Sequence, residues 1–133
     1  MSEKVDIVRR GFDAFETADM AVFMADWAED VVWDVSHYDG WPGDRTSYQG
    51  AADILGAFGQ FLAQMRVQRI DMHEISELPD GRVIAIYSET RGFVDSTEEE
   101  TVEIGILYWL EDGVIERIEV HTGHASARAA AGL

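Results

Sequence analysis

The sequence contains no cysteine among its 133 residues. Disulfide bonds and thiolate chemistry are therefore excluded, and the composition is compatible with a reducing compartment, so we expect a cytoplasmic protein. The sequence also lacks a glycine loop that would cradle phosphates and the motif that exposes a nucleophilic serine. These absences remove most covalent and cofactor-dependent chemistries, and we expect no cofactor.

Basic residues are scarce. Ten Lys and Arg residues stand against 26 Asp and Glu residues, which gives a formal net charge of -16 at pH 7. A surface this acidic repels phosphate backbones and anionic lipid headgroups, so neither nucleic acid nor a membrane surface is an expected partner. Solubility accounts for such a charge without invoking a cationic ligand.

Long apolar runs are missing as well. No stretch approaches the roughly 18 apolar residues of a membrane span, and the opening segment MSEKVDIVRR contains no signal-peptide core. The chain is nevertheless 47% hydrophobic and 11% aromatic, which is typical of a folded globular protein. We expect a single domain that spans residues 1–133.

Three segments have apolar residues at helical spacing. The first covers residues 3–15, and the second runs from Met20 through Trp27, with Asp19 as a possible cap. The third covers residues 50–66 and has the strongest period. Gly56 and Gly59 within it lower helix propensity, and close packing of a neighbouring element is the expected reason.

The remaining pattern is that of strands. A first strand is predicted at 31–36, and four longer ones at 67–78, 82–94, 101–110 and 114–122, joined by hairpin turns such as Asp112-Gly113. This order predicts an antiparallel meander. Both of its faces carry apolar residues, so one face should cover the helices and the other should meet a second subunit. The Ala-rich tail is expected to be a frayed final turn.

The stretch 31–50 concentrates the features that suggest chemistry. Its strand carries one acid, Asp34, and the turn-rich loop 37–49 contains three aromatic residues. We expect this loop to fold back over the domain as a lid, with a rim of a partner interface as the alternative. If Asp34 is buried beside apolar walls, it is a candidate general base. The alternative is a structural acid that caps the loop or pairs with Arg45.

The whole chain resembles the SnoaL-like branch of the nuclear transport factor 2-like superfamily. The resemblance is carried by AEDVVWDVS (28–36), GWPGDRTSYQGAADILGAF (40–58), LEDGVIERIEV (110–120) and AAAGL (129–133). It implies an α+β, cystatin-like cone, with three N-terminal helices packed in a curved, mainly antiparallel sheet around an apolar cavity, and commonly a homodimer. It places the base of the ketosteroid isomerase branch at Asp34.

The resemblance also has departures. His121 stands where relatives commonly carry a Tyr, and Gly123 stands where they carry an Asp, so a second polar group is altered or lost. The acid pair of the limonene epoxide hydrolase branch has no secure counterpart. Strand alternation places His121 on the same outer or rim face as Arg117 and Glu119.

The candidate site follows from the strand and loop pattern of 31–50 and from the family resemblance. The predicted catalytic residues are Asp34 and His121, and Tyr87 and Tyr108 could donate to an oxyanion. The set of Arg82, Glu89 and Arg91 on the strand 82–94 is expected to form cross-strand ion pairs and not to bind substrate. No metal site is expected, because His37, His73 and His124 lack ligand spacing. The side chains predicted to bind substrate are Trp33, Trp41, Tyr48, Phe58, Met72, Tyr87 and Tyr108.

The predicted function is that of a cofactor-free isomerase or cyclase, which moves a proton on an apolar cyclic or polyketide-like molecule. Three alternatives stay open. The first is a non-catalytic carrier that uses the same cavity, the second is a structural dimer with a filled cone, and the third is an epoxide hydrolase.

Overall fold

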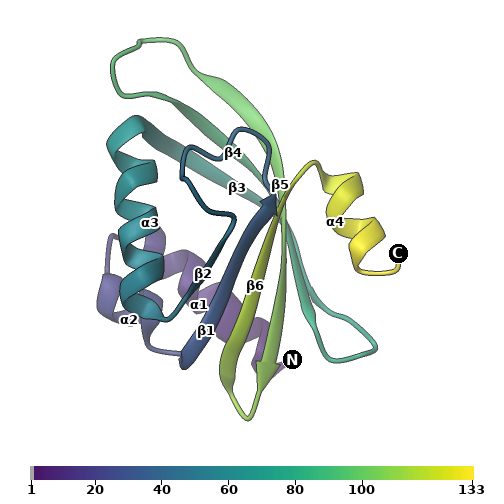
Figure 1. Cartoon of the computed structure of the whole chain (residues 1–133). Helices are drawn as coiled ribbons and strands as arrows, with labels where there is room; N and C mark the ends of the chain where they lie inside the picture. The colour runs from purple at the N-terminus through teal and green to yellow at the C-terminus, as the bar shows by residue number, and fades with distance from the viewer. Residues whose placement is uncertain (1) are drawn as a thin grey trace.

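A computed structural model describes residues 2–133, the side chain of Gln68 excepted. The chain folds as a six-stranded curved sheet with helices on both sides (Figure 1). Three helices, α1 (Glu3–Glu16), α2 (Met20–Met24) and α3 (Ala51–Gln64), lie against the inner face of the sheet, and α4 (His124–Ala130) lies against the outer face. Within residues 2–133, no helix combines the length and the apolar character that crossing a membrane requires.

The strands are β1 (Trp27–His37), β2 (Ser47–Gln49), β3 (Met65–Glu77), β4 (Val83–Phe93), β5 (Glu100–Glu111) and β6 (Val114–Thr122). Their order in the sheet is β2-β1-β6-β5-β4-β3. The predicted antiparallel meander from β3 to β6 is confirmed, and so is the α+β cone with its three helices. Asp112 and Gly113, both with positive φ, form the turn between β5 and β6.

Among residues 2–133, β1 beside β6 is the one parallel pair of the sheet, and it joins β1 and β2 to the meander. This pair brings the N-terminal third of the chain against the last strand, as the side-by-side course of β1 and β6 in Figure 1 shows. Val31, Trp33 and Val35 point into the core, and the residues between them point outward. The orientation of every candidate residue on β1 follows from this register.

The second helix is shorter than predicted. Helical spacing from Met20 to Trp27 suggested one continuous helix, but α2 ends at Met24 and Trp27 already pairs with Ile115 of β6. The amide of Ile115 donates to the carbonyl of Asp26 at 2.7 Å. Pairing with the sheet therefore overrides the local helical period, while Asp19 caps α2 as expected through the amide of Val22.

The apolar outer face is partly covered by the chain itself. The Ala-rich tail, expected to fray, forms α4 and packs on an apolar cluster at the back of the sheet. Gly105 of β5 makes this contact possible, because a Cβ there would lie 2.2 Å from the Cβ of Ala127. The buried residues of the cluster are Leu78, Ile84, Ile86, Leu107, Ala127 and Ala131.

Close packing of a neighbouring element was expected to explain Gly56 and Gly59 of α3, and the structure does not show it. A Cβ at Gly56 or Gly59 would meet nothing within 4 Å, so close packing does not require either glycine. Both positions are exposed. The structure gives no physical reason for them, and their cost in helix propensity remains.

These environments predict opposite effects for two matched substitutions. Gly105→Ala should lower the free energy of unfolding by about 1–3 kcal/mol, because the added methyl overlaps Ala127 and pushes α4 from the sheet. Gly56→Ala should raise it by about 0.5–1 kcal/mol, because the methyl is unobstructed and alanine favours the helix. Urea unfolding of the two variants checks both signs. Equal effects would contradict the packing assigned to α4.

Candidate functional site

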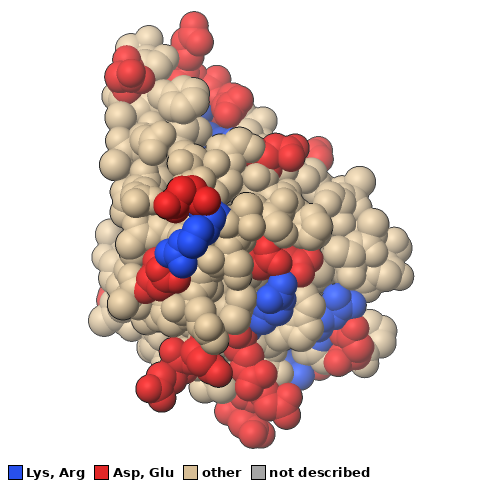
Figure 2. Space-filling model, in the orientation of Figure 1, with Lys and Arg blue, Asp and Glu red and all other residues tan. Residues whose placement is uncertain are grey.

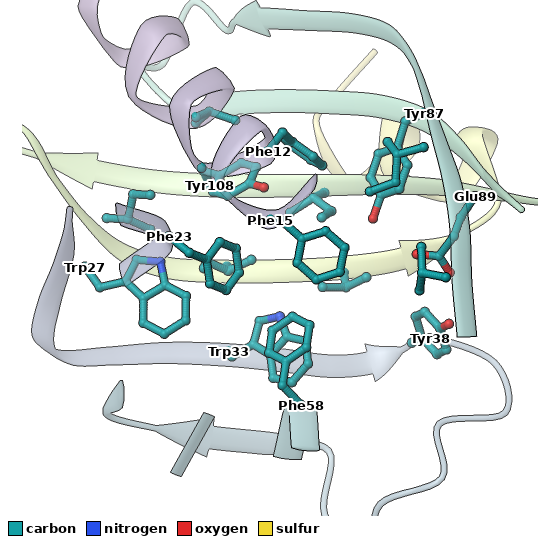
Figure 3. Close-up of a pocket in the computed structure, with 18 of the residues that line it drawn as sticks. Phe12, Phe15, Phe23, Trp27, Trp33, Tyr38, Phe58, Tyr87, Glu89 and Tyr108 are labelled. Carbon is teal, nitrogen blue, oxygen red and sulfur yellow. The ribbon is translucent and has the colours of Figure 1, made fainter. Parts of the chain in front are cut away.

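The inner face of the sheet and the three helices enclose a cavity of about 110 Å³. Half of the residues that line it are aromatic, and the aromatic side chains come from elements far apart in the sequence (Figure 3). Trp33 of β1 stacks on Phe58 of α3 with ring centroids 4.5 Å apart. The aromatic residues that line the cavity are Phe12, Phe15, Phe23, Trp27, Trp33, Tyr38, Trp41, Phe58, Phe61, Tyr87 and Tyr108.

The loop between β1 and β2 folds back over the domain, as predicted for a lid. Trp41 stacks on Phe61 of α3 at 5.5 Å and meets the edge of Trp33 at 5.1 Å. The Trp41 Nε1–H donates to the hydroxyl of Tyr48 at 3.1 Å, and that hydroxyl donates to the carbonyl of Arg45 at 2.9 Å. The loop therefore closes one side of the cavity with Tyr38 and Trp41.

The predicted cavity residues divide into two groups. Five of the seven line the cavity: Trp33, Trp41, Phe58, Tyr87 and Tyr108. Tyr48 is buried next to Trp41 without reaching the cavity, and Met72 packs against the core from β3. Trp33, Tyr87 and Tyr108 reach the cavity from strands, whereas Trp41 comes from the loop after β1 and Phe58 from α3. The other two residues, Tyr48 and Met72, do not line the cavity.

One end of the cavity is polar, and Glu89 and Tyr38 lie there in Figure 3, while Trp27 and Phe23 lie at the other end. Glu89 of β4 is 7% exposed, as is Arg91 two residues on. Arg91 Nη1 lies 3.3 Å from Glu89 Oε2, and Arg91 Nε lies 3.4 Å from Glu100 Oε1. The guanidinium also lies over the ring of Tyr38, 5.2 Å from its centroid. The expected cross-strand pairing is made by Arg91 with Glu100 of β5, whereas Glu89 pairs with Arg91 of its own strand, inside the cone.

Burial raises the pKa of Glu89 from its ordinary 4.5 to about 7, even with Arg91 beside it. Burial also raises the pKa of Tyr87, and the nearby charge of Glu89 adds to this shift. Tyr108, buried as well, has a raised pKa. At neutral pH both phenols keep their protons and can donate hydrogen bonds. The carboxyl of Glu89, with a pKa of about 7, is protonated in part of the molecules and ionised in the rest.

Three tyrosine hydroxyls of the cavity have no hydrogen-bond partner within the described chain, and Tyr108 lies nearer to Phe23 and Trp27 than to Glu89 in Figure 3. The hydroxyl of Tyr38 is fully buried and unpaired, and no hydrogen bond joins Tyr87 Oη or Tyr108 Oη to another described residue. A buried polar group without a partner costs roughly 1–3 kcal/mol. These groups are therefore available to a bound molecule.

Asp34 does not lie in this cavity. Its side chain points to the outer face, where Oδ2 accepts from Arg117 Nη2 at 2.6 Å and Oδ1 accepts from the amide of Ser36 at 2.8 Å. Partial burial opposes ionisation, but the hydrogen bonds from Ser36 and the charge of Arg117 hold the pKa of Asp34 below its ordinary value. The expected orientation is corrected: the odd-numbered residues of β1 face inward, and Asp34 is even-numbered. The alternative partner Arg45 instead pairs with Asp53.

His121 lies on the same outer face, as alternation predicted. Ile118 and Val120 line the cavity, while Arg117, Glu119 and His121 point away from it. His121 is only 2% exposed because α4 covers it, and its ring contacts Glu119 and Ser126. The two predicted catalytic residues therefore lie near each other, but on the opposite side of the sheet from the cavity.

The buried charged residue of the cavity that the sequence argument did not place there is Glu89. A signal for it exists in the strand, because Val83, Ala85 and Tyr87 face inward and Glu89 continues the same alternation. Arg91, two residues further along the strand, instead favoured an ion pair as the interpretation of Glu89. Only the curvature of the sheet shows that this pair is enclosed.

Comparison with known proteins agrees with this architecture. Residues 8–118 match the model of the SnoaL-like domain, so the chain belongs to this family. No curated protein sequence matches the chain significantly.

Solved structures share the fold at low sequence identity. A nuclear transport factor 2-like protein of unknown function from Burkholderia pseudomallei is 21% identical, with a TM-score of 0.79 over 95% of both chains. A candidate polyketide cyclase from Pseudomonas putida is 19% identical, with a TM-score of 0.73 over 94% of both. TerC, co-crystallised with polyporic acid, is 19% identical, with a TM-score of 0.73 over 99% of this chain and 100% of TerC.

The buried carboxyl predicts a pH-dependent stability. Because the pKa of Glu89 is raised in the folded state, native Glu89 holds a proton that the unfolded chain releases. The stability of the wild type should therefore fall, relative to Glu89→Gln, as the pH rises from about 4.5 to 7. The difference should reach on the order of 3 kcal/mol, since one pKa unit is about 1.4 kcal/mol.

Urea unfolding at pH 4.5 and pH 8 measures this difference. Glu116→Gln, which removes an exposed carboxyl of β6, is the matched control for the loss of one charge. If the two variants change with pH in the same way, the burial assigned to Glu89 is wrong.

Proposed function

We propose that the protein is a cofactor-free isomerase or cyclase that transfers a proton on an apolar cyclic ketone bound in the cone. The observation that carries the proposal is Glu89, a buried carboxyl at the polar end of an otherwise aromatic cavity. A general base works best when its pKa lies near the working pH. A pKa of about 7 meets that condition, and the lowered pKa of Asp34 does not.

The roles of the other groups follow from their chemistry. Glu89 would take a proton from the carbon next to the carbonyl and return it to another carbon, so that the reaction needs no oxidant and no metal. The negative charge that develops on the carbonyl oxygen needs hydrogen-bond donors, and Tyr38, Tyr87 and Tyr108 offer unpaired hydroxyls in the same cavity. The aromatic wall would hold the apolar body of the molecule.

Size restricts the ligand. The free space of about 110 Å³ is smaller than the roughly 150 Å³ cavity that accommodates one benzene ring. A single-ring compound therefore fits with small side-chain shifts. A polycyclic ligand of polyketide size requires the loop with Tyr38 and Trp41 to move outward.

The similar structures support this class of ligand without fixing the substrate. One of them is named as a candidate polyketide cyclase, and another was crystallised with polyporic acid. An epoxide hydrolase requires an acid and a base around one water molecule. Besides Glu89, the carboxyl of Asp26 lines the cavity, but Arg10 binds it at 2.9 Å, so we rank this reaction lower.

The decisive test uses hydrogen exchange on carbon. We expect the wild type to catalyse deuterium exchange next to the carbonyl of small cyclic ketones in D2O, with a rate that rises with pH and levels off above about pH 7. Glu89→Gln should lower the rate by about 10²- to 10⁴-fold, because the amide cannot accept the proton. Proton NMR measures the exchange.

Asp34→Asn is the matched comparison, because it also neutralises one carboxyl but on the outer face. We expect it to retain exchange activity. Exchange that survives Glu89→Gln, or that Asp34→Asn abolishes, would contradict the assignment of the base. Ligand-dependent thermal stabilisation of the wild type without any exchange or product would instead identify a carrier protein.

We also propose that the chain forms a homodimer through the outer face of the sheet. The part of this face that α4 leaves uncovered includes Trp109, which lies between the guanidinium groups of Arg82 and Arg117, each 5.5 Å from its ring centroid. On the side of the molecule that Figure 2 shows, acidic side chains cover more of the surface than basic ones, and the basic groups lie beside acidic ones. Sedimentation equilibrium decides the prediction, and a monomer at micromolar concentration would contradict it.

A further inference from the structure

A second polar cluster lies outside the cavity, on the outer face where β1 and β6 run parallel. It consists of His37 at the end of β1 with Glu119 and His121 of β6. One ligand atom from each of the three side chains lies within 4.8 Å of the other two. His37 is exposed, Glu119 is half-buried and His121 is buried.

An irregularity in the sheet creates this cluster. Asp34 pairs with Glu119 and His37 pairs with His121, so three steps along β1 match two steps along β6. In a regular strand, residues three apart point to opposite faces. The extra residue turns His37 to the face that Asp34, Glu119 and His121 already occupy, and its ring lies parallel to that of His121 at 4.5 Å. Bulges commonly redirect a side chain in this way next to functional sites.

Neighbouring groups hold two of the three side chains in place. His121 Nδ1 contacts Ser126 Oγ at 2.8 Å, and its Nε2 lies 2.6 Å from Glu119 Oε1. The second oxygen of Glu119 lies 3.6 Å from Arg117 Nη2. Without a metal, Nε2–H donates to the Glu119 carboxylate, because a carboxylate only accepts. When Nε2 binds a metal instead, the ring proton moves to Nδ1, where the Ser126 hydroxyl can accept it, and such outer hydrogen bonds orient metal-binding histidines.

We propose that His37, Glu119 and His121 bind a divalent transition-metal ion of the Zn²⁺ type. Two imidazole nitrogens and one carboxylate oxygen suit Zn²⁺ and its neighbours, whereas Mg²⁺ and Ca²⁺ prefer oxygen ligands alone. Three protein ligands leave a fourth position, which the exposed side of His37 opens to water. This site is independent of the cavity and of the function proposed for it.

Binding requires a small rearrangement. Zn²⁺ lies in the plane of each imidazole that binds it, so two parallel stacked rings cannot both reach one ion until one of them turns. Bonds of ~2.1 Å also bring tetrahedral ligand atoms to within ~3.4 Å of each other. His37 can turn because its ring is exposed, while its backbone is fixed by Thr122, whose hydroxyl donates to the His37 carbonyl at 3.3 Å.

The local charge favours a cation. Asp34 and Glu119 contribute two negative charges against one positive charge on Arg117, which Asp34 binds at 2.6 Å. The two carboxylates therefore outweigh the one guanidinium before any metal arrives. The formal net charge of -16 adds a long-range attraction for cations over the whole molecule.

Calorimetric titration of the chelator-treated full chain with ZnCl₂ tests the proposal. Mg²⁺ at about 10 mM is present to occupy scattered carboxylates. We expect one Zn²⁺ per chain in the wild type. His37→Gln and Glu119→Gln should each weaken binding at least tenfold. His73→Gln is the matched control, because it removes another exposed histidine at a distance from the cluster and should leave binding unchanged.

NMR of the imidazole nitrogens provides a reading that does not depend on variants. Zn²⁺ should shift the ring-nitrogen resonances of His37 and His121 and leave those of His73 in place. No saturable binding by the wild type would overturn the proposal and leave Glu119, His121 and Ser126 as a hydrogen-bonded anchor for α4. Binding that His37→Gln and His73→Gln weaken equally would overturn it as well.

Discussion

The parallel pairing of β1 with β6 is the constraint on which the rest of the structure depends. It joins β1 and β2 to the meander, and its register decides which side chains of both strands face inward. Trp33 opposite Ile118 contributes to the cavity wall, while Asp34 opposite Glu119 forms part of the polar outer face. Because side chains alternate along a strand, a shift of one residue would exchange the two sets. The same two strands thus build an apolar wall and a polar cluster.

Inside the cone, burial and charge oppose each other at Glu89. A carboxyl removed from water is harder to ionise, so burial raises the pKa of Glu89 to about 7 although Arg91 lies 3.3 Å away. A hydrophobic residue at this position would avoid the cost. Natural proteins tolerate such local conflicts mainly where they serve function. The neighbouring unpaired hydroxyl of Tyr38 is a second conflict of the same kind at the same end of the cavity.

Family membership and structural likeness describe the scaffold more than its chemistry. The similar structures share about a fifth of their residues with this chain and still keep its fold over nearly the whole length. Aromatic packing and strand alternation suffice to maintain such a cone, and they leave the identity of its polar groups free to change. The position of the acid must therefore be taken from this chain's own geometry. Here that geometry points to β4 and not to β1.

The sequence by itself determined the helices at both ends of the cavity, the four-stranded meander and five of the seven predicted cavity side chains. These follow from local periods and turn residues, which the chain carries in short segments. Only the tertiary structure decided that Trp27 joins β6, that Asp34 faces outward, that Glu89 is enclosed and that His37 shares a face with His121. Each of these depends on the register or a bulge between strands distant in sequence, and no local pattern records which residue a strand meets across the sheet.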